Sequence, residues 1–159
     1  MINKYFLEEP NILDLSKEIF NAVVDENLKI ETRFELISKK IEDAETINFI
    51  LADGLGFSNL QSTDSYLNEH INNVVNTTFP SSTNVALTTI AMQANPIDHG
   101  VFSYYMYDKL KYGLINALNW NSENKNLLLS EYFNNQSSIW SVFKENNIYA
   151  SNFQPKNLI

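Results

Sequence analysis

The sequence predicts an α/β fold in which helices flank a mostly parallel sheet. Short apolar runs alternate along the chain with longer amphipathic stretches, which is the pattern of βαβ units. The chain has 159 residues, 44% of them hydrophobic, and both values are typical of one folded globular domain. We divide it into a helical leader, residues 1–44, and an α/β region, residues 45–159.

The leader carries two amphipathic stretches. Apolar residues recur at helical spacing in residues 9–25, and Pro10 is tolerated near a helix start. The same spacing recurs over residues 30–42. We therefore expect two helices before the first strand.

The pattern then changes to short apolar runs. Residues 46–52 are rich in Ile and Phe and end at Asp53, so they read as a buried strand. Residues 57–73 follow as a helix, and residues 74–79 as a second strand, which Pro80 ends.

The remaining elements continue this alternation. Residues 82–94 are predicted as a helix that begins at Ser82 or Thr83, and the Tyr-rich stretch 95–113 as a loop. The later elements are a strand, a helix and a strand, at 114–120, 137–147 and 148–153. Because no helix closes the sheet after the last strand, we expect residues 45–159 to be the amino-terminal portion of a longer domain.

Composition excludes several functions. The net charge of −8 argues against binding a nucleic-acid polymer, which depends on Lys and Arg. No apolar run reaches the roughly 18 residues of a membrane span, and acidic residues interrupt the first residues where a signal peptide is apolar. The chain has no cysteine, which excludes disulfides and thiolate metal sites and suits a cytoplasmic location.

Asp53 is the first candidate site residue. It follows a predicted strand, at the edge of an α/β sheet where ligands bind, and Gly54 and Gly56 allow close approach of a ligand. A carboxylate there can coordinate a cation. The alternative is that Asp53 caps the next helix.

Thr83 is the second candidate. A hydroxyl at a helix start lies among unpaired N–H groups and at the positive end of the helix dipole. Both favour an alkoxide and a bound phosphoryl group, and a nearby metal ion lowers the pKa of a hydroxyl further. The alternative is an ordinary Ser/Thr helix cap.

Three segments together resemble the alkaline phosphatase superfamily, most closely its type I phosphodiesterase/nucleotide pyrophosphatase family. In that family a strand ends in a metal-binding Asp followed by Gly, a Pro precedes the nucleophile by three residues, and a Pro-x-x-His-Gly turn follows. The chain has Asp53 before Gly54, Pro80 before Thr83, and a matching turn at residues 96–100. The resemblance extends over roughly residues 45–159.

The resemblance implies a chemistry. Asp53 is expected to bind one metal ion and Thr83 to be both nucleophile and metal ligand, forming a phospho-threonine intermediate that metal-bound water hydrolyses. The complete enzyme is expected to bind two divalent metal ions, for which Zn²⁺ is the first candidate. Its substrate is expected to be a small phosphate ester. Ser82 and Thr78 lack the spacing of the nucleophile.

Other residues near this motif have two possible roles each. Asn84 is expected either to donate to a phosphate oxygen or to serve the helix start. Tyr104 stands where nucleotide pyrophosphatases have an Asn that stabilises phosphate oxygens, and is expected to donate a hydrogen bond there or to pack. Tyr105 and Tyr107 either line a pocket or fill space. His99 is expected to be structural and hydrogen-bonded, since the family's His at that turn is not a usual metal ligand.

The sequence lacks the family's later metal ligands, because no Asp or His follows Asp108. We therefore expect the chain to supply the nucleophile half of a phosphoester hydrolase site and to be inactive alone. The alternative is a non-catalytic binding module derived from the same fold. The sequence leaves open monoester against diester substrates and the oligomeric state.

Overall fold

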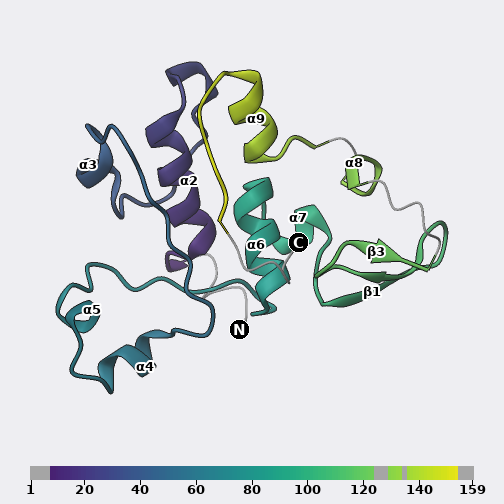
Figure 1. The fold of residues 1–159 in the computed structure, drawn as a ribbon, viewed down its shortest axis with the longest axis horizontal. Helices are drawn as coiled ribbons and strands as arrows, with labels where there is room; N and C mark the ends of the chain where they lie inside the picture. Colours follow the sequence, from purple (N-terminus) through teal and green to yellow (C-terminus); the bar gives the residue numbers. More distant parts are fainter. Residues whose placement is uncertain (1–7, 124–128, 134–135, 154–159) are drawn as a thin grey trace.

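A computed structural model describes residues 8–123, 129–133 and 136–153 of the chain (Figure 1). Three helices form its centre: α2 (Ile12–Val23), α6 (Thr83–Met92) and α9 (Ile139–Glu145). Helix α6 contacts both α2 and α9, and the rings of Phe20 and Phe143 stack at 5.8 Å between α2 and α9. The predicted helices at 9–25, 82–94 and 137–147 are therefore confirmed, each with shorter bounds.

Helix α2 begins with a capping box. The Asn11 side chain accepts hydrogen bonds from the N–H groups of Leu13 and Asp14, and the Asp14 carboxylate accepts one from the N–H of Asn11. These bonds satisfy N–H groups that a helix start leaves unpaired. Leu13 and Phe20 lie on the same face of α2, and both are buried.

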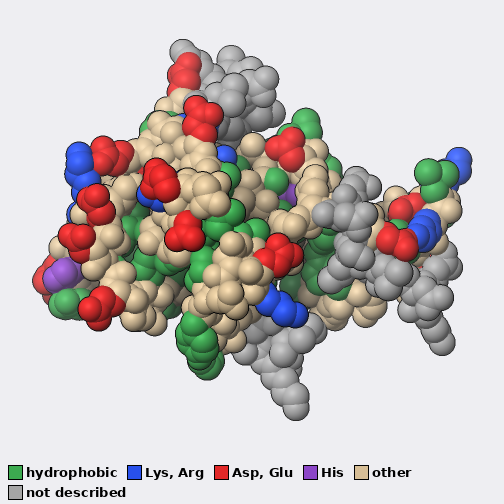
Figure 2. Space-filling model, turned by 90° about the horizontal axis from the view of Figure 1, so that it is seen from above, with side chains coloured by type: hydrophobic (Ala, Val, Ile, Leu, Met, Phe, Trp, Pro, Cys, Tyr) green, Lys and Arg blue, Asp and Glu red, His purple; other side chains and the backbone are tan. Residues whose placement is uncertain are grey.

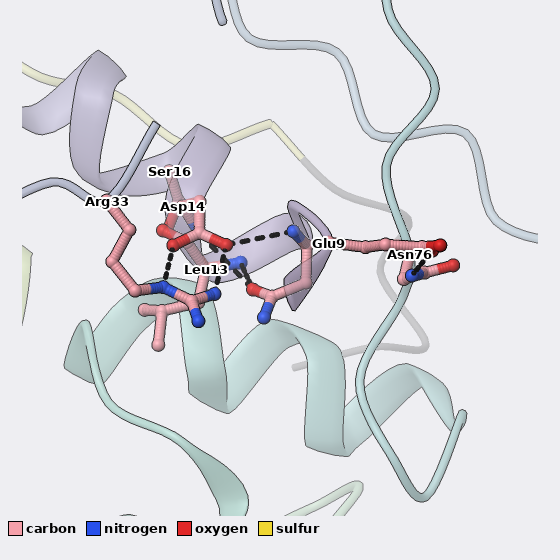
Figure 3. A network of polar contacts seen from close by, with 7 residues as sticks. Glu9, Leu13, Asp14, Ser16, Arg33 and Asn76 are labelled. Carbon is pink, nitrogen blue, oxygen red and sulfur yellow. Dashed lines mark hydrogen bonds and ion pairs between the residues drawn. The ribbon is translucent and has the colours of Figure 1, made fainter. Parts of the chain in front are cut away.

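Two buried carboxylates of α2 hold the segment that follows it. Asp14 accepts two hydrogen bonds from Arg33, at 2.9 Å from Nε and 2.6 Å from Nη2, and Figure 3 shows the guanidinium directed at this carboxylate. Glu18 accepts from the backbone of residues 36–38. The helix predicted over residues 30–42 is reduced to α3 (Ser38–Ile41), after the short 3₁₀-helix η1 (Glu26–Leu28), because backbone N–H groups bond to Glu18 instead of to helix carbonyls.

The predicted mostly parallel sheet is the main correction. Within the described residues, 46–52 form no strand and expose their apolar side chains, with Ile50 84% exposed. The second predicted strand, 74–79, makes only one parallel bridge, between Asn76 and Asn11. An apolar run becomes a strand only with a partner for its backbone, and these runs lie beside no other strand.

The sheet of the described residues is small and antiparallel. Its strands are β1 (Tyr105–Asp108), β2 (Gly113–Asn116) and β3 (Asn121–Ser122), in the order β1-β2-β3, with Met106 opposite Ile115. β1 and the short helix α7 (Pro96–His99) lie in the stretch predicted as a loop, so that prediction is wrong. The strand predicted over 114–120 forms only in its first part, and residues 148–153 form no strand. The α/β class is confirmed in this mixed form.

A separate lobe carries two short helices in place of the one predicted over residues 57–73. They are α4 (Phe57–Gln61) and α5 (Tyr66–Glu69), and the Ser65 side chain caps the second. Figure 1 shows this lobe extending away from the three central helices. The remaining helix, α8 (Leu129–Tyr132), comes between β3 and α9 along the chain.

The core lies between α6 and the sheet. Val85, Val101 and Ala117 are fully buried, and partly buried Met106, Trp120, Tyr132 and Phe133 pack on them. Figure 2 shows Asp and Glu side chains spread over one face of the molecule with few Lys and Arg among them. No helix of the described residues has both the length and the apolarity that a membrane crossing demands.

Candidate functional site

The structure brings Asp53 and Thr83 together. The Thr83 hydroxyl donates a hydrogen bond of 3.0 Å to Oδ2 of Asp53, across 30 residues of sequence. Asp53 is exposed and Thr83 half-buried, so the pair is open to solvent. The two residues that the sequence singled out independently therefore form one site, although the strand expected to present Asp53 does not form.

Thr83 is the first residue of α6. Ser82 is the N-cap residue, with extended backbone, and its side chain makes no capping bond; it donates instead to Oδ1 of Asn84 at 2.9 Å. Thr83 is therefore no helix cap, since its hydroxyl bonds to Asp53. Among the described residues, no side chain caps the N–H groups of the first turn of α6. Because Thr83 is the first residue of the helix, its hydroxyl lies beside the positive end of the helix dipole.

Asp53 lies in a tight turn. Gly54 has φ of 73°, which favours glycine, and its carbonyl accepts from the side chain of Asn59 at 3.1 Å. The next helix, α4, begins at an N-cap of Gly56 and has no side-chain cap. Asp53 is therefore not the cap of that helix, and its carboxylate points to Thr83.

Tyr104 joins the same site. Its hydroxyl donates to Oγ1 of Thr83 at 3.2 Å, a different contact from the hydrogen bond to a phosphate oxygen considered above. The ring is 38% exposed, so packing alone does not describe it. Sequence comparison with the family placed Tyr104 near the nucleophile, but gave no sign that it would contact Thr83 itself.

Asn84 points away from the open side of the site. It is 3% exposed, and its amide nitrogen donates to the carbonyl of Ser103 at 2.6 Å. Its Oδ1 accepts from Ser82. This geometry favours the role at the helix start, and it ties α6 to the segment that carries Tyr104.

His99 is buried, and both ring nitrogens are bonded. The N–H of Val101 donates to Nδ1 at 3.1 Å, so the proton of the neutral ring lies on Nε2, which bonds Oγ1 of Thr89 at 3.0 Å. Burial lowers the pKa of His99 below its ordinary value of 6.5, against the opposing charge of Asp98. The arrangement agrees with the structural role expected for this His.

The remaining candidates lie elsewhere. Thr78 donates to the carbonyl of Pro80 at 2.9 Å. Tyr105 and Tyr107 lie on the exposed face of β1. Asp108 accepts from the N–H groups of two residues in the β1–β2 turn, Leu110 and Lys111. None of these side chains has a hydrogen bond to Asp53 or Thr83 among the described residues.

The candidate site supplies only some of the ligands that a metal ion needs. The oxygens of Asp53 and Thr83 suit a divalent cation, but protein zinc sites use at least three ligands. In the described parts of the chain, no three His, Cys, Asp or Glu residues gather closely enough to hold a metal ion. The residues present fit one side of a metal centre.

Comparison with protein-family models, with curated proteins and with solved structures found no match for this chain. The geometry of Asp53, Thr83 and Tyr104 is therefore the basis for a functional proposal.

Proposed function

We propose that this chain contributes the nucleophile half of a metal-dependent hydrolase of phosphate esters. The observation that supports the proposal is the hydrogen bond from the Thr83 hydroxyl to Asp53 at the start of α6. A hydroxyl bonded to a carboxylate and adjacent to unpaired helix N–H groups has the surroundings of an activated nucleophile.

The chemistry assigns one role to each residue. Oγ1 of Thr83 attacks phosphorus, the alcohol leaves, and a phospho-threonine forms that water then hydrolyses. Asp53 would hold the metal ion and orients the hydroxyl of Thr83, and the N–H groups of the first turn of α6 bind phosphoryl oxygens. A divalent ion, for which we expect Zn²⁺, supplies Lewis-acid stabilisation and lowers the pKa of the hydroxyl when it is bound.

The complete site would use two divalent ions, as two-metal hydrolysis requires. Asp53 and Thr83 supply two oxygen ligands, so the other ligands would come from outside the residues described here. The substrate would be a small phosphate ester. Its exact class is left to experiment, because the residues around Thr83 do not distinguish a monoester from a diester.

The test combines metal binding with detection of the intermediate. Zn²⁺ titration by calorimetry should show weak binding to the wild-type chain, and Asp53→Asn should weaken it by about tenfold or more because one of few ligands loses its charge. With Zn²⁺ and 4-nitrophenyl phosphate or its bis-ester, peptide mass spectrometry should find phosphate on Thr83. Thr83→Ala should abolish this signal and Thr83→Ser should retain it.

Either of two results would overturn the proposal. One is Zn²⁺ affinity that is the same in wild type and Asp53→Asn. The other is Zn²⁺ binding at Asp53 with no phosphorylation of Thr83 by either ester, which would favour the non-catalytic binding module.

A further inference from the structure

The Thr83 hydroxyl lies between two polar groups that act on it differently. Oδ2 of Asp53 is 3.0 Å from Oγ1 and the Tyr104 hydroxyl is 3.2 Å from it. An ionised carboxylate can only accept a hydrogen bond, so the single proton of Thr83 is directed at Asp53. Tyr104 must then be the donor, and the order of the chain of bonds is fixed: Tyr104 to Thr83 to Asp53.

The position of Tyr104 is set by its backbone. The carbonyl of Ser103 accepts from the amide of Asn84 at 2.6 Å, and the carbonyl of Tyr104 accepts from the N–H of Ala117 at 2.8 Å. Asn84 and Ala117 are both buried, one in α6 and one in the core beside the sheet. The backbone that carries the phenol is therefore fixed at two consecutive residues, although the Tyr104 side chain is partly exposed.

We propose that Tyr104 is a positioning residue that directs the Thr83 hydroxyl at Asp53 and stabilises the negative charge that Oγ1 gains as its proton passes to Asp53. The inference rests on the proposed function, because it takes Thr83 as the nucleophile. A hydrogen bond to a developing anion is stronger than one to a neutral hydroxyl, so Tyr104 contributes more as the proton leaves than at rest. This activation comes from the chain itself and acts without a metal ion.

A fluorophosphonate in buffer with a metal chelator tests the inference on the chain as it is. Oγ1 of Thr83 forms a bond to phosphorus, the phosphorus–fluorine bond breaks, fluoride leaves, and the hydroxyl proton passes to Asp53 and on to solvent. Peptide mass spectrometry measures how fast Thr83 gains the phosphonyl group. Thr83→Ala is the blank for labelling at this position.

Tyr104→Phe keeps the ring and removes the donor. We expect labelling of Thr83 to slow by about 10-fold to 100-fold, the range for one lost donor to a developing anion. The half-saturating probe concentration should stay the same, because Tyr104 acts on Thr83 and not on the probe. Tyr105→Phe is the matched control, since Tyr105 is 61% exposed and lies outside the site; its labelling rate should equal that of wild type.

A second substitution guards against misfolding of Tyr104→Phe. Replacement of Tyr104 by 3,5-difluorotyrosine makes the phenol a stronger donor at nearly the same size, and in buffer acidic enough to keep the phenol protonated it should speed labelling. Equal labelling rates in wild type, Tyr104→Phe and the fluorinated protein would overturn the inference while leaving Thr83 as nucleophile. Absence of labelling at Thr83 in wild type would overturn the inference alone, because the Zn²⁺ and phosphate-transfer measurements test the proposed function separately.

Discussion

Replacing Glu18 with Gln should destabilise the chain more than replacing an exposed carboxylate with its amide. Glu18 lies on α2 and is 2% exposed. Its carboxylate accepts hydrogen bonds from the N–H groups of Leu36, Ile37 and Ser38 at 2.6, 2.8 and 2.7 Å, and from the Ser38 hydroxyl at 2.6 Å. It therefore fastens residues 36–38 to α2.

The size of the effect follows from these four bonds. A Gln side chain has one accepting oxygen without net charge, and its NH₂ group would face N–H donors that it cannot serve. Each hydrogen bond to a charged group contributes about 1.5–3 kcal/mol, and an unsatisfied buried donor costs about 1–3 kcal/mol. The segment at residues 36–38 is only half-buried, so water relieves part of the cost. We expect the free energy of unfolding to fall by about 2–4 kcal/mol, or about 5–15 °C in melting temperature for a chain of this size.

Glu18 also predicts a pH dependence. Burial alone would raise the pKa of Glu18, but the hydrogen bonds from Ser38, Ile37 and Leu36 outweigh it and hold the pKa below its ordinary value of 4.5. A carboxylate with a lowered folded pKa stabilises the fold fully above its unfolded value and loses that contribution as pH falls through the folded value. The difference in unfolding free energy between wild type and Glu18→Gln should therefore be constant well above 4.5 and shrink below it.

Urea unfolding followed by circular dichroism, repeated across this pH range, measures both effects. Glu35→Gln is the matched control, because Glu35 is an exposed carboxylate in the same segment and is paired with the exposed Lys39. Its loss should cost no more than about 0.5 kcal/mol, as for other surface ion pairs. Equal destabilisation by the two substitutions, or a difference that does not change with pH, would refute this account of Glu18.

Two further predictions concern other buried polar groups. Asp14→Asn should lower the free energy of unfolding by about 1.5–3 kcal/mol in the same urea assay, because the Arg33 guanidinium loses a buried, charged partner. Stability should also fall as pH decreases from 6.5, because burial lowers the pKa of folded His99 and the unfolded chain then binds a proton first. His99→Gln should remove that slope and His70→Gln, at an exposed position, should leave it in place.

The helices were the most predictable part of the fold. Apolar spacing and an Asn before an acidic residue mark the start of α2 in the sequence, and these signals are local. The strand expected at residues 46–52 does not form, because the apolar content of a run does not show whether another strand lies beside it. The antiparallel sheet was missed because the sequence of its first strand did not suggest a strand. Its first strand consists of Tyr105 to Asp108, where the Tyr residues that suggested a loop lie on an exposed strand face.

For the candidate site, only the family resemblance brought Asp53 and Thr83 together in the sequence, as ligands of one metal ion. The structure places Oγ1 of Thr83 3.0 Å from Oδ2 of Asp53, without the strand that was expected to present Asp53. The bond from Asn84 to Ser103 had no signal in the sequence, because a side chain that binds a carbonyl leaves no pattern in neighbouring residues. The contact of Tyr104 with Thr83 had no such signal either.

The two sides of the site are anchored very differently, which leads to a last prediction. Tyr104 is tied to α6 and to the core through backbone hydrogen bonds, whereas the Asp53 turn is bonded to the α4 segment that follows it and, among the described residues, has one hydrogen bond to a more distant part of the chain, the one from Thr83. Thr83→Ala should therefore loosen the turn and leave the other side unchanged.

Amide hydrogen exchange in residues 50–56 should speed up by about 3-fold to 10-fold, as for the loss of one hydrogen bond, with no change near Tyr104. Thr83→Ser, which keeps the hydroxyl, should restore the wild-type rate. Equal exchange in the Ala and Ser variants would show that the hydroxyl does not hold the turn, and that Asp53 reaches the site through packing alone.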